Sequence, residues 1–193
     1  QNAVPVGQGS MVAILGVSVE DIEYFIASVA TNDGLVEIAN DNAPGQVVIS
    51  GDLKTLDLII KLAKESGIRK IIKLSVSAPF HSSLMKPAAS IMENALKSIN
   101  FLEPNFPIIS NVSAIPETSP QTIKNNLVLQ VTQRVRWRET MASLSRLGIS
   151  QIVEMGTGRV LTGLAKRGAQ NIHALNLETS ENILSWLNNE KLI

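Results

Sequence analysis

The segment Ser75–Lys86, SVSAPFHSSLMK, joins an apolar run to the start of a helical pattern and carries one of the chain's two histidines. Pro79 fixes its own φ and pushes the residue before it toward extended geometry, which predicts a turn. Ser82 and Ser83 can cap the helix that follows, so His81 is expected at a helix N-terminus. Histidine accepts and returns protons near neutral pH, because its ordinary pKa is about 6.5. His81 is either a catalytic base or an ordinary loop histidine, and the local sequence leaves both open.

Before this segment the pattern is strand, helix, strand, strand, helix, strand. Apolar runs predict strands at 11–15, 35–40, 46–50 and 71–76. Helical spacing predicts one helix through Ile22, Phe25, Ile26 and Val29, which begins at a capping box formed by Ser18 and Asp21. It predicts a second helix through Leu56, Ile59, Ile60 and Ala63, which stops near Gly67. Asp41–Gly45 is rich in turn formers. This order is that of the split βαβ, ferredoxin-like fold.

After this segment strands and helices alternate, which indicates an α/β layer. We expect a long helix at 84–99, helices at 122–131, 137–147 and 160–167, and strands at 106–110, 149–155 and 172–177. Three short strands leave edges that need partners, so this is only part of a sheet.

Composition excludes several classes of protein. The 193 residues include 17 basic and 17 acidic ones, and this neutral balance argues against nucleic acid as the main partner. There is no cysteine for a disulfide or a thiolate metal site, and two distant histidines disfavour zinc. His173 is interpreted as structural. No apolar run approaches the ~20 residues of a membrane span, and no signal peptide is visible. We therefore expect a cytoplasmic protein with no metal and no membrane contact.

Several motifs share a resemblance. Residues 77–85, SAPFHSSLM, resemble the histidine motif of malonyl-CoA:acyl carrier protein transacylases and polyketide-synthase acyltransferase domains. Other segments agree with that family in the same order: 1–14, 40–51, 110–112, Gln130 with 135–137, and 154–164. The resemblance covers nearly the whole chain and implies the C-terminal portion of the family's fold. It implies residues 1–9 as the end of an upstream helix or linker, 10–76 as a ferredoxin-like small subdomain, and 77–193 as the C-terminal part of an α/β-hydrolase-like core.

The resemblance also implies roles for site residues. His81 matches the base and Gln130 the glutamine whose backbone carbonyl orients it, although alone Gln130 reads as a helix-surface residue. Phe80 matches a position associated with malonyl selectivity, and a core phenylalanine is the alternative. Asn40 and Asn42 would contact the thioester arm, but both are also common turn residues.

Half of the expected active site is absent from these 193 residues. The nucleophilic serine of this family lies in a Gly-x-Ser-x-Gly turn, which the sequence does not contain. The arginine that binds the malonyl carboxylate would precede Gln1, which itself indicates a fragment or a processed chain. We therefore expect this chain alone to be inactive, and the complete enzyme to be a monomer without a cofactor.

The implied function is malonyl transfer from malonyl-CoA to the phosphopantetheine thiol of acyl carrier protein, through an acyl-serine, in fatty acid biosynthesis. The alternatives are a related acyltransferase for a different acyl-CoA and a non-catalytic, ferredoxin-like ligand-binding module. Arg134, Arg136, Arg138 and Lys166–Arg167 could steer the acidic carrier or coenzyme A, although the last pair also suits a helix C-terminus. Gly156–Gly158 begins like a dinucleotide fingerprint, but Leu161 replaces its third glycine, so a nucleotide site is rejected.

Overall fold

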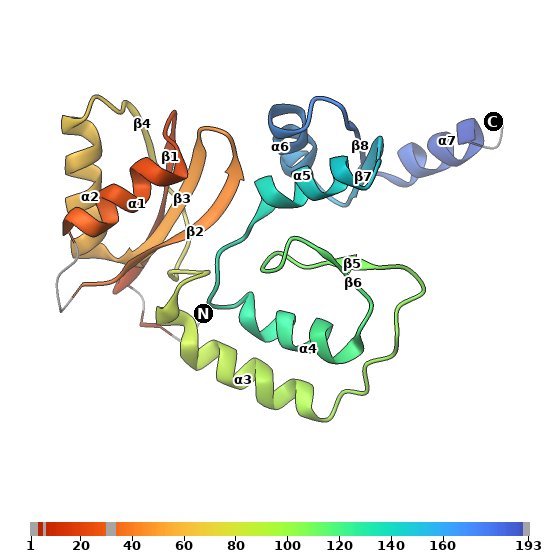
Figure 1. Ribbon diagram of the computed structural model, residues 1–193, viewed down its shortest axis with the longest axis horizontal. Helices are drawn as coiled ribbons and strands as arrows, with labels where there is room; N and C mark the ends of the chain where they lie inside the picture. Colours follow the sequence, from red (N-terminus) through yellow and green to blue (C-terminus); the bar gives the residue numbers. More distant parts are fainter. Residues whose placement is uncertain (1–3, 6, 30–33, 191–193) are drawn as a thin grey trace. The chain divides into compact units, whose positions relative to one another are not determined.

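The structure is a computed structural model that describes residues 4–5, 7–29 and 34–190 (Figure 1). The chain divides into two compact units, Gln1–Thr140 and Met141–Ile193, which are described separately. Residues 1–3 and 6, which belong to the segment 1–9 expected to end an upstream helix, lie outside the described residues. No helix in the described ranges is long and apolar enough to cross a membrane.

The first unit begins with a four-stranded antiparallel sheet in the order β2-β3-β1-β4. Strands β1 and β2 run in the same direction, because β3 lies between them and is antiparallel to both. The elements are β1 (Gly9–Leu15), α1 (Val19–Val29), β2 (Val36–Ala43), β3 (Gln46–Asp52), α2 (Leu53–Glu65) and β4 (Lys70–Lys73). Their order agrees with the pattern read from the sequence.

Helices α1 and α2 cover one face of this sheet (Figure 1). Apolar residues of both helices and of β1 and β3 form the main core there: Val12, Ile14, Ile22, Ile49, Leu56 and Ile59. Each helix begins at a side-chain cap. The Ser18 hydroxyl accepts the amide of Asp21 and the Asp21 carboxylate accepts the amide of Ser18, so the predicted capping box is confirmed, while Asp52 caps α2.

The opposite face of the sheet carries the segment that contains His81. Met11, Ala13, Ala39 and Val48 form a second buried cluster on that face, and Leu74, Val76 and Phe80 pack against it. The backbone of β1 comes closest to this segment at Gly9. A Cβ atom there would lie 2.5 Å from the ring of Pro79, so only glycine allows this approach. Gly9 therefore helps to place the turn that precedes His81.

Two strands of this sheet, β2 and β4, end three residues away from their predicted ends. β2 continues to Ala43, so the turn shrinks to Pro44 and Gly45 and Asp41 is a buried strand residue. The sequence did not indicate the end of β2, because the residues there are of turn-forming types. Two register shifts also make this strand irregular. β4 ends at Lys73, where its ladder with β1 stops opposite Val12, and Leu74 and Val76 then pack against the second buried cluster.

The rest of the first unit is mainly helical. It contains the 3-10 turn η1 (Ser83–Met85), α3 (Lys86–Lys97), the short strands β5 (Ile108–Ile109) and β6 (Pro116–Glu117), α4 (Pro120–Leu129) and the start of α5 (Trp137–Arg146). The expected helix at 84–99 is thus a 3-10 turn followed by α3. The sequence predicts a strand of an α/β layer at 106–110, but β5 is only two residues long and pairs antiparallel with β6. β6 was not predicted.

The second unit contains the end of α5, β7 (Gln151–Met155), α6 (Val160–Gly168), β8 (His173–Leu177) and α7 (Ser180–Glu190). β7 and β8 pair in parallel, and α6 connects them and packs on both strands. The sequence predicted all of these elements except α7. His173 is exposed on β8.

We predict that Gly9→Ala lowers the free energy of unfolding by about 1–3 kcal/mol, because the added methyl group overlaps the rigid Pro79 ring. Gly163→Ala is the matched control. Its methyl group would meet only Arg167 Nη2 at 3.8 Å, within α6, so a gain of about 0.5–1 kcal/mol is expected. Urea unfolding measures both variants. A Gly9→Ala protein as stable as the wild type would show that the Pro79 turn does not depend on this approach.

Candidate active site

His81 lies in the turn between β4 and η1, where its ring is partly buried. Its Nδ1 atom is 2.8 Å from the backbone carbonyl oxygen of Gln130, 49 residues further along the chain. A carbonyl only accepts hydrogen bonds, so Nδ1 carries the hydrogen and donates it. In the neutral ring, Nε2 is then left as an acceptor, which is the state that a general base requires.

The carbonyl of Gln130 is available because of its place in α4. Gln130 is the C-terminal cap of this helix, and the last carbonyls of a helix have no partner within it. Ser119 caps the other end of the helix, and Asn126 within it is buried. The end of α4 therefore presents a backbone acceptor to His81.

The backbone of His81 is held in a left-handed conformation, with φ at 56°. The Ser82 hydroxyl, which was expected to cap the next helix, donates instead to the carbonyl of Pro79 at 2.6 Å. The amide of Ser83 donates to the Glu37 carboxylate of β2 at 2.5 Å. The predicted serine caps are therefore wrong, because a carboxylate from a distant strand takes the role. Nothing in the sequence marked Glu37.

A cavity of about 360 Å³ lies beside His81. Its lining comes from β2, the β5–β6 connection and the segment after α4: Glu37, Ile38, Val112, Thr132, Gln133, Arg134 and Arg136. Phe80, Asn40 and Asn42 are not among its lining residues. Phe80 packs on two buried clusters. One is the cluster on the sheet face opposite α1 and α2, and the other is formed by Val4, Ala78 and Met85. Asn40 and Asn42 lie within β2 rather than at its end.

The segment Arg134–Arg136 forms one wall of this cavity by pairing with the free edge of β2. Val135 donates its amide to Ala39 at 2.8 Å and accepts the amide of Asp41 at 2.9 Å. The amide of Arg136 donates to the carbonyl of Asn111 at 2.9 Å. These bonds join the sheet, α4 and the β5–β6 connection within the first unit.

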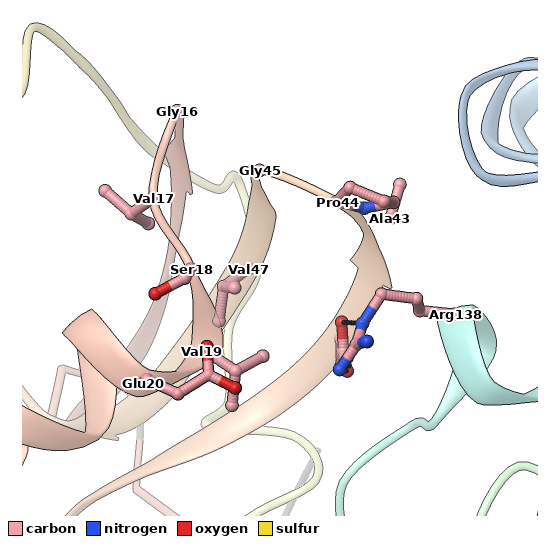
Figure 2. Close-up of a pocket in the computed structure, with 11 residues that line it drawn as sticks. Gly16, Val17, Ser18, Val19, Glu20, Ala43, Pro44, Gly45, Val47 and Arg138 are labelled. Atoms are coloured by element: carbon pink, nitrogen blue, oxygen red, sulfur yellow. Dashed lines mark hydrogen bonds and ion pairs between the residues drawn. The ribbon is translucent and has the colours of Figure 1, made fainter.

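Asp41 anchors the chain just after this wall. Its carboxylate is 1% exposed and accepts the Nε atom of Arg138 at 2.9 Å and Nη2 at 2.8 Å. Hydrogen bonding to Asp41 raises the pKa of Arg138 above its ordinary value, although burial opposes this. Figure 2 shows Arg138 reaching from α5 toward β2, beside a cavity of about 430 Å³ at the β1–α1 loop and the β2–β3 turn. The sequence missed Asp41 because it stands among turn formers.

The other arginines of this region also have acidic partners. Arg136 pairs with Glu139 and donates to the carbonyl of Val112, while Arg134 lies 3.8 Å from Glu23. Their positive charges are therefore compensated locally, which weakens the idea that they steer an acidic partner. No cluster of acidic residues and histidines within the described ranges could hold a metal ion.

The glycine loop between β7 and α6 is also occupied by a side chain. Glu154 accepts the amides of Leu161 and Thr162 at 3.0 and 2.8 Å and the Thr162 hydroxyl at 2.7 Å. Burial raises the pKa of Glu154, but these hydrogen bonds outweigh it, so the net pKa lies below its ordinary value. A carboxylate at the helix N-terminus takes the place that a phosphate would need, which agrees with the rejected nucleotide site.

Comparison with known proteins gives a consistent group of relatives. Malonyl CoA-acyl carrier protein transacylase of Bacillus subtilis (strain 168) is 40% identical over 181 residues, which cover 94% of this chain and 57% of that protein. The crystal structure of acyl-carrier-protein-S-malonyltransferase from Bartonella henselae has a TM-score of 0.91 and 48% identity, and the match covers 96% of this chain. The chain belongs to the malonyl CoA-acyl carrier protein transacylase family.

Other members of the transacylase family agree. The transacylase of Staphylococcus aureus (strain COL) is 33% identical over 188 residues, which cover 97% of this chain and 61% of that protein. A malonyl-transacylase in complex with a type II PKS acyl-carrier protein has a TM-score of 0.92 and 38% identity. The chain spans 57% to 61% of the length of these relatives. No family model matches it.

We predict that Arg138→Met lowers the free energy of unfolding by about 2–4 kcal/mol, because it leaves the buried Asp41 carboxylate unpaired. Asp41→Asn in the same protein should restore part of this loss. Arg134→Met is the control, since its pair with the exposed Glu23 should contribute less than about 1 kcal/mol. Equal losses for Arg134→Met and Arg138→Met in urea unfolding would contradict this account.

The Glu154 cap should depend on pH. Its pKa is lower in the folded protein than in the unfolded chain, so its stabilisation is present above the unfolded value of about 4.3 and is lost as pH falls through the folded value. Glu154→Gln should therefore lower the melting temperature at about pH 7 and have a smaller effect at about pH 3. The same loss at both pH values would mean that the charge of Glu154 is unimportant.

Proposed function

We propose that this chain is the histidine-bearing portion of a malonyl-CoA:acyl carrier protein transacylase, which moves malonyl groups onto acyl carrier protein for fatty acid biosynthesis. The observation that carries the proposal is the hydrogen bond from His81 Nδ1 to the carbonyl of Gln130, which leaves Nε2 free to accept a proton. The 48% identity to an acyl-carrier-protein-S-malonyltransferase supports the substrate assignment. A ligand-binding module would have no need of an oriented base.

In the proposed reaction, His81 Nε2 takes the proton of a serine hydroxyl as the serine oxygen attacks the thioester carbonyl of malonyl-CoA. The carbon–sulfur bond then breaks, and the leaving coenzyme A thiol receives that proton. The phosphopantetheine thiol of the carrier repeats these steps in reverse on the malonyl-serine. The serine and the carboxylate-binding arginine would come from residues outside these 193, which contain no Gly-x-Ser-x-Gly sequence.

We also propose how the chain is divided into subdomains and which further residues contact the substrate. We assign residues 10–76 to a ferredoxin-like subdomain, which the sheet order β2-β3-β1-β4 supports, and residues 77–193 to part of an α/β-hydrolase-like core. Asn40 and Asn42 are proposed to contact the thioester arm, and Phe80 to limit the space beside His81. The packing of Phe80 on two clusters gives it a structural role as well.

A chimera tests the function directly. The matching 181-residue segment of the Bacillus subtilis transacylase is replaced by this chain, and malonyl transfer from malonyl-CoA to acyl carrier protein is measured. We expect transfer by the chimera and none by the 193 residues alone. His81→Ala in the chimera should lower kcat/KM by ~10²- to 10⁴-fold, the usual contribution of a general base.

Two controls accompany that variant. Gln130→Ala should keep most of the activity, because the backbone carbonyl and not the side chain bonds His81. His173→Ala should be neutral, since His173 is exposed on β8. A chimera that transfers malonyl equally well with and without His81 would refute the proposed base.

A further inference from the structure

Glu37 makes a contact to the His81 turn that the reaction described above does not use. Its carboxylate accepts the backbone amide of Ser83 at 2.5 Å, across 46 residues of sequence. Glu37 also lines the cavity beside His81. A strand of the sheet therefore bonds directly to the backbone two residues after the histidine.

The conformation of His81 explains why this contact matters. A non-glycine residue at φ 56° is in an unfavourable region and persists only where its surroundings fix it. On one side, the Ser82 hydroxyl holds the carbonyl of Pro79. On the other, Glu37 holds the amide of Ser83. The Gln130 bond fixes the ring, and these two bonds fix the backbone that carries it.

We propose that Glu37 is a positioning residue for His81: by accepting the Ser83 amide it fixes the left-handed turn and so directs His81 Nδ1 at the Gln130 carbonyl. The catalytic meaning of this role rests on the proposed function, but the positioning itself does not. Glu37 acts here as a hydrogen-bond acceptor. Its negative charge beside Arg134 and Arg136, which line the same cavity, is the competing explanation.

Substitutions of different chemistry separate the two explanations. Glu37→Gln keeps an acceptor of the same length and removes the charge. Glu37→Met keeps the length and removes both, and Glu37→Asp keeps the charge but is one methylene too short to reach the amide. If the acceptor is what matters, Gln should behave like the wild type and both Met and Asp should lose the contact.

The readout is nuclear magnetic resonance of the ¹⁵N-labelled 193-residue chain, which needs no substrate. The chain has only two histidines, so His173 serves as an internal reference for the ring signals of His81. We expect the wild type and Glu37→Gln to show His81 mainly protonated at Nδ1. In Glu37→Met and Glu37→Asp the ring should shift toward a mixture of tautomers, and the Ser83 amide should exchange with water ~10-fold faster, as for the loss of one hydrogen bond.

Asp52→Ala is the matched control, because Asp52 is another carboxylate of the sheet that accepts backbone amides, from Leu35 at 2.6 Å and Thr55 at 2.9 Å. It should lower stability without changing the His81 ring signals. The proposal is overturned if the ring signals are unchanged in a folded Glu37→Met or Glu37→Asp protein, if Glu37→Gln behaves as they do, or if Asp52→Ala changes the ring equally. These outcomes are independent of malonyl transfer, so failure of the proposed function would appear only in the chimera.

Discussion

A hydrogen bond between a side chain and a backbone carbonyl 49 residues away joins the parts of the first unit around His81. It forms only if the end of β4, the turn that precedes η1 and the end of α4 are all in place. Gly9 allows Pro79 to pack on β1, and the Arg134–Arg136 segment pairs with the edge of β2. The rest of the first unit therefore determines the geometry of one imidazole ring.

His81 is oriented by a backbone carbonyl rather than by a carboxylate, and this difference has chemical consequences. In serine proteases a buried carboxylate orients the histidine and adds a negative charge beside it. The carbonyl of Gln130 fixes the same ring nitrogen as a donor but carries no net charge. The end of α4 supplies this acceptor without any special side chain, which explains why a glutamine on a helix carries no sign of its role when considered alone.

The sequence predicted regular elements better than the contacts that join them. Periodicity identified α1, α2 and the central strands, because apolar spacing directly reflects which face is buried. It ended β2 too early, because Asp41 is of a turn-forming type and the partner of its buried carboxylate, Arg138, lies 97 residues away. It also missed β6, which is two residues long, and α7.

The candidate site shows the same contrast between local sequence patterns and long-range contacts. His81 and Gln130 were expected together from the family resemblance, and the structure brings them within 2.8 Å. Glu37 was not expected, because a glutamate in an edge strand usually faces solvent and no local pattern shows that it reaches Ser83. Local patterns predict elements, whereas such long-range polar contacts depend on the tertiary arrangement.

The protonation of His81 is the most direct test of this account, and neutron diffraction from deuterium-exchanged crystals of the chain at neutral pH locates the hydrogen itself. We expect a deuterium on Nδ1, on the line to the Gln130 carbonyl oxygen, and none on Nε2. A ring with deuterium on Nε2 alone, or a ring turned away from Gln130, would contradict it, because no nitrogen would then be both oriented by the carbonyl and free to accept a proton.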